Sequence, residues 1–281
     1  MISVLGSTGQ VGSAFAGLLP DARFLTRSDL DLSRADVDTI EKRLSGSEFV
    51  INCAAYTGVD AAETELASAM AVNGTAVGRL AEATARMDVP FVTYSSDYVF
   101  DGQASSPYLE THPPDPINAY GRSKLAGEVL ALAANPRSLV IRTSWVLSAT
   151  HPNFVTAILK RVIQGTAVKV VNDQTGCPTV AIDLAAATLQ AIGAGLRGVL
   201  HLTNQGQTTW FELARRSVAV AGLDENLVSP CTTAEYPTPA RRPTYSVLGS
   251  VVADVADLLG LPTWEASLES VVRGSLSLLR G

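Results

Sequence analysis

The sequence predicts an α/β fold, a doubly wound parallel sheet of the Rossmann type with a small discontinuous C-terminal lobe. Two observations indicate it. Apolar, strand-like runs alternate with helical segments through the first half of the chain, and polar or glycine-rich segments follow directly on several of those runs. Such alternation produces a parallel sheet with helices on both faces, whose ligands lie at the carboxyl ends of the strands. We therefore expect a ligand cleft along that edge.

The expected elements follow in order along the chain. Strand-like runs occupy residues 1–5, 22–26, 49–53, 90–95 and 138–143, with helical patterns over 11–19, 37–44, 61–87 and around 120–130. The second half is less regular, with a helix near 154–164, short strands near 168–171 and 199–202, and a proline-rich stretch over 237–243. We predict a dinucleotide-binding domain over residues 1–145, with strands at about 166–171 and 198–203 returning to its sheet. Residues 146–281 then form most of a discontinuous substrate-binding lobe.

Composition limits the class of protein. The chain has 281 residues, of which 47% are hydrophobic and 17% charged, as in an ordinary globular protein with a sizeable core. A net charge of −6 argues against a nucleic-acid-binding protein. No apolar run is long enough to cross a membrane, and Met1 leads directly into the first strand without a signal peptide. Three isolated cysteines fit a reduced compartment and give no metal spacing, so we expect a cytoplasmic protein without a metal.

Gly6, Gly9 and Gly12 lie in a turn between the first strand and the first helix. Glycine at such a turn lets the backbone approach a pyrophosphate closely, and the helix N-terminus that follows attracts the anion. The spacing is Gly-x-x-Gly-x-x-Gly, which differs from the Gly-x-Gly-x-x-Gly dinucleotide fingerprint. The alternative is a tight turn without a ligand. The strand-turn-helix context favours a bound nucleotide.

Arg27 follows the second strand, where many NAD-binding proteins carry an acidic residue that bonds the ribose 2′-hydroxyl. Thr26, Arg27 and Ser28 stand there instead. A guanidinium can bind the 2′-phosphate of NADPH. The sequence therefore predicts that NADPH is preferred and NADH tolerated, unless Arg27 stacks on adenine or faces solvent.

Tyr120 and Lys124 are one helical turn apart, on one face of a helix. A nearby ammonium favours a phenolate, so we expect Lys124 to lower the pKa of Tyr120 and make it a general acid and base. Ser96 follows the fourth strand, where its hydroxyl can point into the cleft. By itself the segment 95–102 is also typical of a serine-rich turn. Together, the hydroxyl, phenol and ammonium suit hydride transfer to a carbonyl.

These features together resemble a known family. The glycine turn, the segment Ser-Ser-Asp-Tyr-Val-Phe-Asp-Gly over 95–102 and the Tyr-x-x-x-Lys pair are similar to the extended short-chain dehydrogenase/reductases. Segments 52–63, 142–146, 172–179 and 237–243 resemble the dTDP-4-dehydrorhamnose reductase family over essentially the whole chain. The resemblance implies reduction of the 4-keto group of dTDP-4-dehydro-6-deoxy-L-mannose to dTDP-L-rhamnose by a nicotinamide cofactor.

The resemblance also implies roles for individual residues. Ser96 stands in place of the family's catalytic threonine, Tyr120 is the proton donor, and Lys124 is its partner. The expected cofactor contacts include Gly6, Gly12, Arg27 and Ala54 at the strand ends, together with Tyr120 and Lys124. The resemblance adds Gly9, Gln10, Val11, Asp31, Leu32, Ala55, Tyr56, Thr57 and Tyr94. The expected substrate contacts are Ser96, Asp97, Trp145, Gln174, Arg241 and Arg242. Core packing for Trp145, and a solvated loop for Arg241 and Arg242, are the alternatives.

Two other functions stay open at this point. One is a related reductase of dTDP-4-keto-deoxysugars in antibiotic or dihydrostreptose-type sugar biosynthesis. The other is a non-catalytic, cofactor-binding regulatory subunit, which the intact set of Ser96, Tyr120 and Lys124 argues against. Some family members join two subunits through a metal held by acidic residues. No matching acidic cluster is found in this sequence, so we expect a monomer or a homodimer with no metal.

Overall fold

The computed structural model describes residues 1–252 and 255–280. Its centre is a six-stranded, fully parallel sheet in the order β10-β5-β4-β3-β1-β2. The strands are β1 (Ile2–Leu5), β2 (Arg23–Leu25), β3 (Phe49–Asn52), β4 (Phe91–Ser96), β5 (Ser138–Thr143) and β10 (Gly198–His201). The order in which successive strands join the sheet reverses between β1 and β3. Doubly wound sheets bind their ligands at such a point. The predicted fold class is confirmed.

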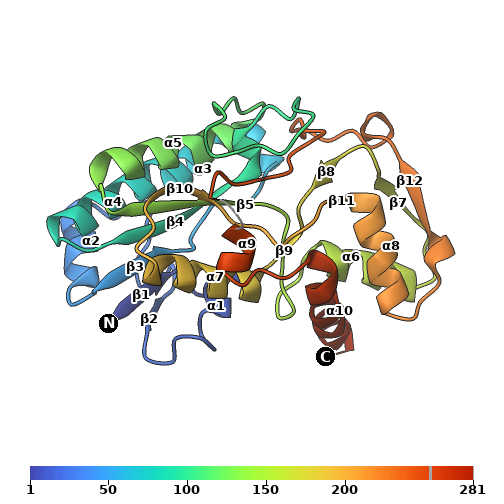
Figure 1. Cartoon of the computed structure of the whole chain (residues 1–281), viewed down its shortest axis with the longest axis horizontal. Helices are drawn as coiled ribbons and strands as arrows, with labels where there is room; N and C mark the ends of the chain where they lie inside the picture. The colour runs from blue at the N-terminus through green and yellow to red at the C-terminus, as the bar shows by residue number, and fades with distance from the viewer. Residues whose placement is uncertain (253–254, 281) are drawn as a thin grey trace.

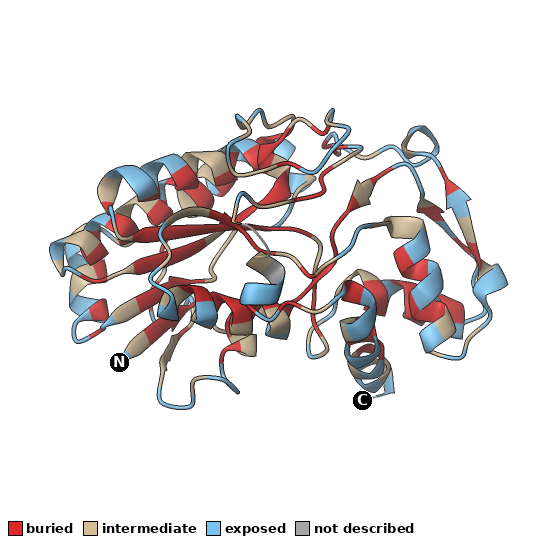
Figure 2. Cartoon of the chain, viewed as in Figure 1, coloured by how far each residue is buried: buried red, intermediate tan, exposed pale blue. Residues whose placement is uncertain are grey.

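Helices cover both faces of the sheet (Figure 1). One face carries α2 (Val37–Leu44), α4 (Ala76–Arg86) and α5 (Ala119–Ala134), which pack side by side. The other face carries α1 (Gln10–Ala14) and α7 (Ala181–Gly193). Each face has its own apolar core, and the central strands β1, β3, β4 and β5 between them are almost wholly buried (Figure 2). This burial on both sides explains why the strands read as continuous apolar runs.

The segment expected as one long helix over 61–87 is interrupted. It consists of a 3₁₀ turn (Ala61–Glu63), α3 (Leu66–Met70), a π-helical turn (Ala71–Thr75) and α4. The buried Asn73 lies in the π turn, where its side-chain amide accepts from Tyr56 N and donates to Tyr56 O and to Ser123 Oγ, all within 3.0 Å. The carbonyl of Asn73 lies against Gly127, where an added Cβ would be 2.1 Å from it. The interruption thus joins the loop after β3 to helix α5.

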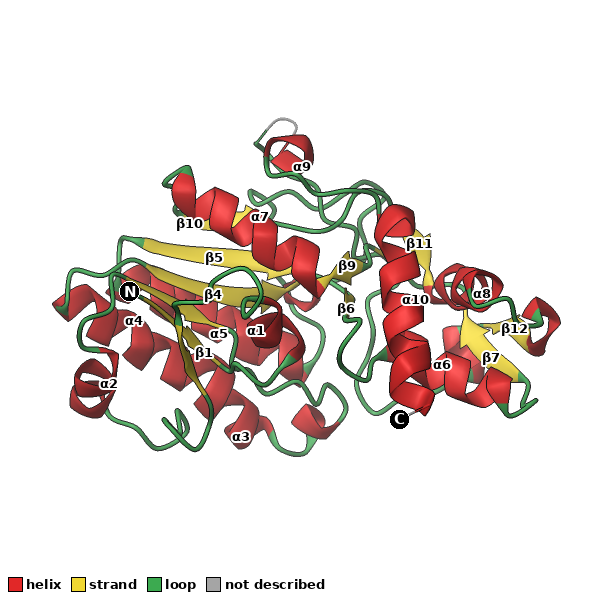
Figure 3. Cartoon of the chain, turned by 90° about the horizontal axis from the view of Figure 1, so that it is seen from below, coloured by secondary structure: helices red, strands yellow, loops and turns green. Residues whose placement is uncertain are grey.

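The C-terminal lobe has a separate core (Figure 3). Helices α6 (Phe154–Ile163), α8 (Trp210–Val220) and α10 (Trp264–Arg280) pack around the parallel pair β7 (Val168–Val171) and β12 (Val228–Cys231). Shorter elements complete the lobe and its junction with the sheet. They are β6 (Val146–Leu147), β8 (Thr175–Gly176), β9 (Thr179–Val180), β11 (Thr208–Thr209) and α9 (Val255–Leu258).

A strand at 166–171 was expected to return to the main sheet. This prediction is wrong, because β7 pairs with β12 in the lobe. Its side chains alternate between buried Val168 and Val170 and exposed Lys169. Such alternation is typical of a strand that is covered on one face only, whereas the central strands of the main sheet are covered on both. The second expected strand lies within 198–203, where β10 pairs with β5. The domain boundaries themselves stay a prediction.

A segment after the lobe strand β12 crosses back to the sheet domain, and we call residues 237–249 the return segment (Figure 1). Pro243 lies so close to Gly102 that a Cβ there would be 2.4 Å away, and Gly102 has a φ of +79°. Leu248 forms a parallel bridge with Tyr108. The chain therefore leaves the lobe after β12 and packs against the sheet domain before it returns to the lobe at α10. Among the described helices, none is long and apolar enough to cross a membrane.

Candidate active site

The glycine turn lies at the carboxyl end of β1, against the loop after β3. Gly6 has a φ of +69°, and a Cβ there would be 2.5 Å from Ala54 N. A Cβ on Gly12 would be 2.2 Å from Gly6 O. Both glycines are therefore required for the close approach of strand, turn and helix, and Gly9 closes the turn with its N–H on Gly6 O at 3.1 Å.

A cavity of about 300 Å³ opens beside this turn. Eight of the expected cofactor residues line it: Gly6, Gly9, Arg27, Asp31, Leu32, Ala54, Ala55 and Tyr56. Gln10, Val11, Gly12 and Thr57 are neighbours of these residues in the chain and do not line it. Gln10 Oε1 is buried and has no hydrogen-bond partner among the described residues. An acceptor without a donor beside the glycine turn fits a bound cofactor with hydroxyl or amide donors.

Tyr94, another expected cofactor residue, does not line this cavity. Its hydroxyl bonds to Thr188 Oγ1 on α7 at 2.8 Å, and burial raises its pKa well above the ordinary value. The side chain is thus turned to the other face of the sheet. Only its backbone carbonyl faces α5, where it accepts a hydrogen bond from Lys124 Nζ at 2.6 Å.

Arg27 is 83% exposed at the rim of the cofactor cavity. Its guanidinium is 3.6 Å from Asp31, and the Ser28 hydroxyl lies next to it in the chain. The pKa of Asp31 is lowered, first by hydrogen bonds from Ser33 and less by Arg27. Arg27 therefore makes one weak, exposed ion pair and can reorient towards an anion.

Tyr120 and Lys124 are held by the first turns of α5. Asn118 caps this helix by accepting from Gly121 N at 2.7 Å, and a Cβ on Gly121 would be 2.0 Å from Tyr98 O. Lys124 is buried, and burial lowers its pKa to about 8.

The expected effect of Lys124 on Tyr120 is wrong for this structure. The pKa of Tyr120 is raised, first by burial and then by the negative charge of Asp97, while Ser96 lowers it. The Lys124 ammonium is instead hydrogen-bonded to the Tyr94 carbonyl. The spacing of Tyr120 and Lys124 predicted their shared helix face, but the depth of their burial could not be predicted from it. Tyr120 is consequently a neutral phenol at physiological pH, which suits a proton donor.

Ser96 and Asp97 close the carboxyl end of β4. Ser96 Oγ donates to Asp97 Oδ1 at 2.9 Å and accepts from Tyr98 N at 3.2 Å. Asp97 is 2% exposed, and burial raises its pKa to about 6 against the effect of hydrogen bonds from Ser246 and Ser96. In the part of the chain that the structure describes, Asp97 Oδ2 is buried without a partner, as are Ser95 Oγ and Thr143 Oγ1. These polar atoms gather where β4 and β5 end.

A second cavity of about 490 Å³ lies between the lobe and the loop after β3. Of the expected substrate residues, Gln174 and Arg242 line it. Arg242 is ion-paired to Asp60 at 2.9 Å. Arg241 is exposed, and its carbonyl accepts from Asn118 Nδ2 at 2.9 Å. The backbone of Arg241 thus anchors the N-terminus of α5, and a role of its guanidinium in binding the substrate stays a prediction.

Trp145 adopts a φ of +46° and packs against Gly176, where an added Cβ would be 2.5 Å from the indole. Its ring stacks on Trp210, with centroids 3.7 Å apart and planes 11° apart, and Trp210 lines the second cavity. Trp145 is thus behind the wall of that cavity. Sequence reasoning missed several lining residues of the lobe, which carry no motif: Phe154, Arg161, Lys169, Trp210 and Tyr236.

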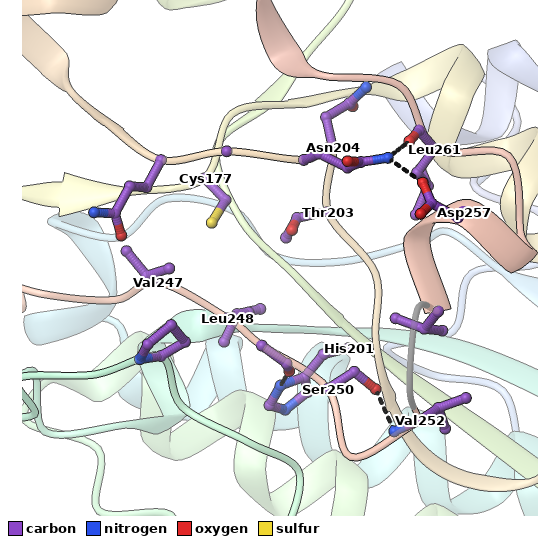
Figure 4. A pocket seen from close by; sticks show the side chains of 16 residues that line it. Cys177, His201, Thr203, Asn204, Val247, Leu248, Ser250, Val252, Asp257 and Leu261 are labelled. Carbon is purple, nitrogen blue, oxygen red and sulfur yellow. Dashed lines mark hydrogen bonds between the residues drawn. The ribbon is translucent and has the colours of Figure 1, made fainter.

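A third cavity of about 500 Å³ lies near the end of β10 (Figure 4). It shares no lining residue with the second cavity. Its walls include Cys177, His201, Thr203 and Leu248. His201 is hydrogen-bonded through Nδ1 to Gly249 O at 2.7 Å, and burial lowers its pKa. Among the described residues, no group of three or more His, Cys, Asp or Glu side chains could hold a metal ion.

Tyr120 lies between residues of the first two cavities, although it lines neither of them. It packs against the same small cluster of buried alanines as Tyr56, which lines the cofactor cavity. Its ring also meets the Tyr98 ring edge to face at 5.9 Å, and Tyr98 lines the second cavity. A proton donor at this junction can serve a group that reaches it from the second cavity while a dinucleotide lies in the first.

Comparisons with known proteins agree with this arrangement. The family model described as "RmlD substrate binding domain" matches residues 1–276. A dTDP-4-dehydrorhamnose reductase of Burkholderia thailandensis is 40% identical over 98% of this chain and 99% of its own. A probable dTDP-4,6-dihydroxy-2-methyloxan-3-one 4-ketoreductase of Streptomyces antibioticus is 38% identical over 94% of this chain and 90% of its own.

A solved structure is also similar. The dTDP-4-dehydrorhamnose reductase of Bacillus anthracis in complex with NADP has a TM-score of 0.90 and 32% identity, covering 96% of this chain and 97% of that one. The full-length match to the family and the identities of about 40% lead to one conclusion: the chain belongs to the RmlD substrate binding domain family.

Proposed function

We propose that this protein is an NADPH-dependent reductase that converts the 4-keto group of dTDP-4-dehydro-6-deoxy-L-mannose to the alcohol of dTDP-L-rhamnose. The observation that carries the proposal is the position of Tyr120, a half-buried neutral phenol that packs against the same alanine cluster as Tyr56 of one cavity and meets the ring of Tyr98 of the other. The names of the relatives, all reductases of dTDP-linked sugars, support the same reaction.

The second cavity suits a nucleoside diphosphate sugar. Arg161, Lys169 and Arg242 supply three cations around it, which matches the charge of a diphosphate. Trp210, supported by its stack on Trp145, offers an aromatic face. A volume of about 490 Å³ is within the usual range for a small-molecule site. The diphosphate would compete with Asp60 for Arg242, so this ion pair has to open when the substrate binds.

The residues of the glycine turn and the first cavity would hold the cofactor, which supplies the hydride when it is bound. Tyr120 then gives a proton to the carbonyl oxygen as that oxygen becomes negative. Ser96 holds the same oxygen in place with its hydroxyl. Lys124, whose ammonium is hydrogen-bonded to the Tyr94 carbonyl, would position the ribose of the cofactor. Arg27 at the cavity rim would bind the 2′-phosphate, which supports NADPH as the preferred cofactor and NADH as a tolerated one.

The test is a steady-state assay of the purified protein with NADPH and a panel of dTDP-4-keto-6-deoxy sugars. We expect the highest kcat/KM with the L-mannose epimer. Tyr120→Phe keeps the ring and removes the proton, so kcat should fall about 10²–10⁴-fold while the affinity for NADPH and the sugar nucleotide is kept. A higher kcat/KM with another 4-keto sugar would move the substrate assignment to that sugar. A Tyr120→Phe enzyme that turns over like the wild type would reject the mechanism.

A further inference from the structure

Glu128 on α5 and Arg142 on β5 form an ion pair that is closed off from solvent. Their side chains are 3% and 4% exposed, and Arg142 donates through Nε to Glu128 Oε1 at 2.9 Å and through Nη2 to Oε2 at 2.6 Å. Neither residue lines any of the three cavities described above. Burying two charges costs the solvation of both, so such a pair is weak evidence for a purely stabilising role. Its place in the fold points to a second role, because Glu128 is one helical turn from Lys124.

Lys124 and Glu128 are placed to attract each other. Residues four apart on a helix are neighbours, and opposite charges attract more strongly in a buried site than at the surface. Lys124 is 6% exposed. Even so, among the described residues the ion pair of Glu128 is with Arg142, and Lys124 Nζ donates to the Tyr94 carbonyl at 2.6 Å. The ammonium thus bypasses the carboxylate one turn along its own helix.

Arg142 explains this choice, because it occupies both oxygens of Glu128 and is itself held in place. Its guanidinium carbon lies 5.0 Å from the centre of the Phe100 ring, and Nη1 is 3.4 Å from His201 Nε2. His201 Nδ1 bonds to the Gly249 carbonyl, so Nδ1 carries the ring proton and Nε2 is left as an acceptor for Arg142. A planar guanidinium fixed in this way binds a carboxylate bidentately, which an ammonium cannot do.

Charged side chains on the other elements around α5 have partners of their own. Helix α5 packs against α3, α4, β4, β5, the turns at 61–63 and 71–75 and the 3₁₀ turn Asp97–Val99. Apart from Arg142, the charged residues of these elements, each hydrogen-bonded to a group other than Lys124, are Glu63, Arg79, Glu82, Arg86 and Asp97. The tyrosines, all with raised pKa values and therefore neutral, are Tyr94, Tyr98 and Tyr120. Burial lowers the pKa of Lys124, and Glu128 is the charge that raises it.

We propose that Arg142 is a positioning residue, which keeps the Lys124 ammonium available to the cofactor ribose by holding both oxygens of Glu128. The inference rests on the proposed reductase function, in which Lys124 positions that ribose. Without Arg142, an unpaired carboxylate is left in the interior, where an isolated charge is strongly unfavourable. Lys124 then pairs with Glu128 and leaves both the Tyr94 carbonyl and the ribose.

The two single substitutions that break the pair distinguish this role from a structural one. Arg142→Met leaves a buried carboxylate that draws Lys124 away, whereas Glu128→Gln leaves no carboxylate to compete for it. If the pair only fastened α5 to β5, the two variants would loosen the same contact and impair cofactor binding alike. The proposal requires unequal effects on the cofactor and opposite effects on Lys124.

The first test observes Lys124 without cofactor or turnover. The chain has four lysines, and the three besides Lys124 are exposed: Lys42, Lys160 and Lys169. NMR of protein labelled with ¹³C at lysine Cε therefore gives four signals, of which the one missing in Lys124→Met belongs to Lys124. The pKa of Lys124 read from this signal should be about 8 in the wild type. It should be at least about one unit higher in Arg142→Met, because the ammonium then pairs with Glu128, and lower than the wild type in Glu128→Gln.

The second test measures the affinity for NADPH by fluorescence titration, at a pH well below the Lys124 pKa of about 8. Arg142→Met should raise the Kd about 10–100-fold, which is the loss of one hydrogen bond to a charged group. NADH should lose the same factor, because the ribose is common to both cofactors. Glu128→Gln should stay within about threefold of the wild type. The double variant Glu128→Gln/Arg142→Met also lacks the competing charge, so it should recover the affinity that Arg142→Met loses.

A control and a replacement variant complete the set. Arg137→Met breaks the ion pair of Arg137 with Asp88 at the start of β5 and should change neither the Lys124 pKa nor the Kd for NADPH. If Arg142→Met does not fold, Arg142→Lys takes its place. Its ammonium engages one oxygen of Glu128 at a time, so the same changes should appear in the same direction and be smaller.

Three results would overturn the proposal: equal losses of NADPH affinity in Arg142→Met and Glu128→Gln, no recovery in the double variant, or a Lys124 pKa that neither single variant changes. The reductase proposal is decided separately, by turnover of dTDP-4-keto sugars by the wild type. If the wild type reduces none of them, that proposal fails, and the NMR titration still decides whether Arg142 keeps Glu128 from Lys124.

Discussion

Replacing Asp97 by asparagine should make the folded protein more stable at neutral pH, although the change removes a group from the active site. Burial raises the pKa of Asp97 from 3.8 to about 6. Each pKa unit corresponds to about 1.4 kcal/mol, so the ionised carboxylate destabilises the folded state by about 3 kcal/mol at neutral pH. The asparagine amide places N–H donors where Oδ2 has no partner, at a cost of about 1–2 kcal/mol. The net gain is about 1–2 kcal/mol, or about 2–4 °C in Tm for a chain of this size.

The sign of this effect depends on pH. A raised pKa means that the folded protein binds the proton more tightly than the unfolded chain does. The stability from that proton is fully present below the unfolded value of 3.8 and is lost as the pH rises through about 6. Asparagine has no such proton. At about pH 4 the wild type should therefore be the more stable protein, and above the pKa of about 6 the variant should be.

The assay is thermal unfolding of both proteins at roughly pH 4.5 and pH 7.5, below and above the folded pKa. Asp101→Asn serves as the control of opposite sign, because its pKa is lowered by hydrogen bonds that the carboxylate accepts. It should destabilise at the higher pH and much less at the lower one. If Asp97→Asn unfolds below the wild type at both pH values, or by the same difference at both, the reasoning about its burial is refuted.

Other perturbations test other parts of the site. Arg27→Ala should raise the KM for NADPH about tenfold through loss of a charge-assisted contact and leave the KM for NADH unchanged; equal effects on both would show that Arg27 does not bind the 2′-phosphate. Arg242→Gln should raise the KM for the sugar nucleotide about tenfold with a smaller change in kcat, measured in the same assay, and an unchanged KM would remove this residue from the diphosphate site. Gly127→Ala should lower the stability by about 1–3 kcal/mol, because its Cβ would meet the Asn73 carbonyl, whereas Gly193→Ala, with open space around it, should not; denaturant unfolding of both would show this. Treatment with a chelator should leave the activity unchanged, and a loss that added Mg²⁺ restores would contradict the expectation of a metal-free enzyme.

The motifs of the sheet domain could be predicted well from the sequence. Each of them combines a residue type with a recognisable position relative to the neighbouring strand or helix. Gly6 and Gly12 could be recognised because a strand and a helix flank them. Tyr120 and Lys124 share a helix face by spacing alone. The direction of the Tyr120 pKa shift could not be predicted in the same way, since burial and the charge of Asp97 raise this pKa, and neither follows from the spacing of Tyr120 and Lys124.

The lobe was less predictable. Lys169 and Trp210 line the second cavity from a strand and a helix whose sequences carry no motif, and only the tertiary arrangement brings them together. The partner of β7 could not be read from a four-residue apolar run, because such a run indicates a strand without indicating its neighbour. The interruption at Asn73 was likewise hidden, since the residues that Asn73 contacts, Tyr56 and Gly127, are far from it in the sequence.

The return segment has a consequence for how the enzyme is made. Ser246 reaches Asp97, and Arg242 reaches Asp60, from a part of the chain that is synthesised long after the sheet domain. A nascent chain on the ribosome can form the six-stranded sheet once β10 has emerged, and domains generally fold in this order during synthesis. Until the return segment follows, such a chain has its glycine turn and catalytic helix but lacks one wall of the pocket. A chain truncated before residue 237 would consequently have an unfinished active site, and it would also lack Leu259 and Leu261 of the core that covers the α7 face of the sheet.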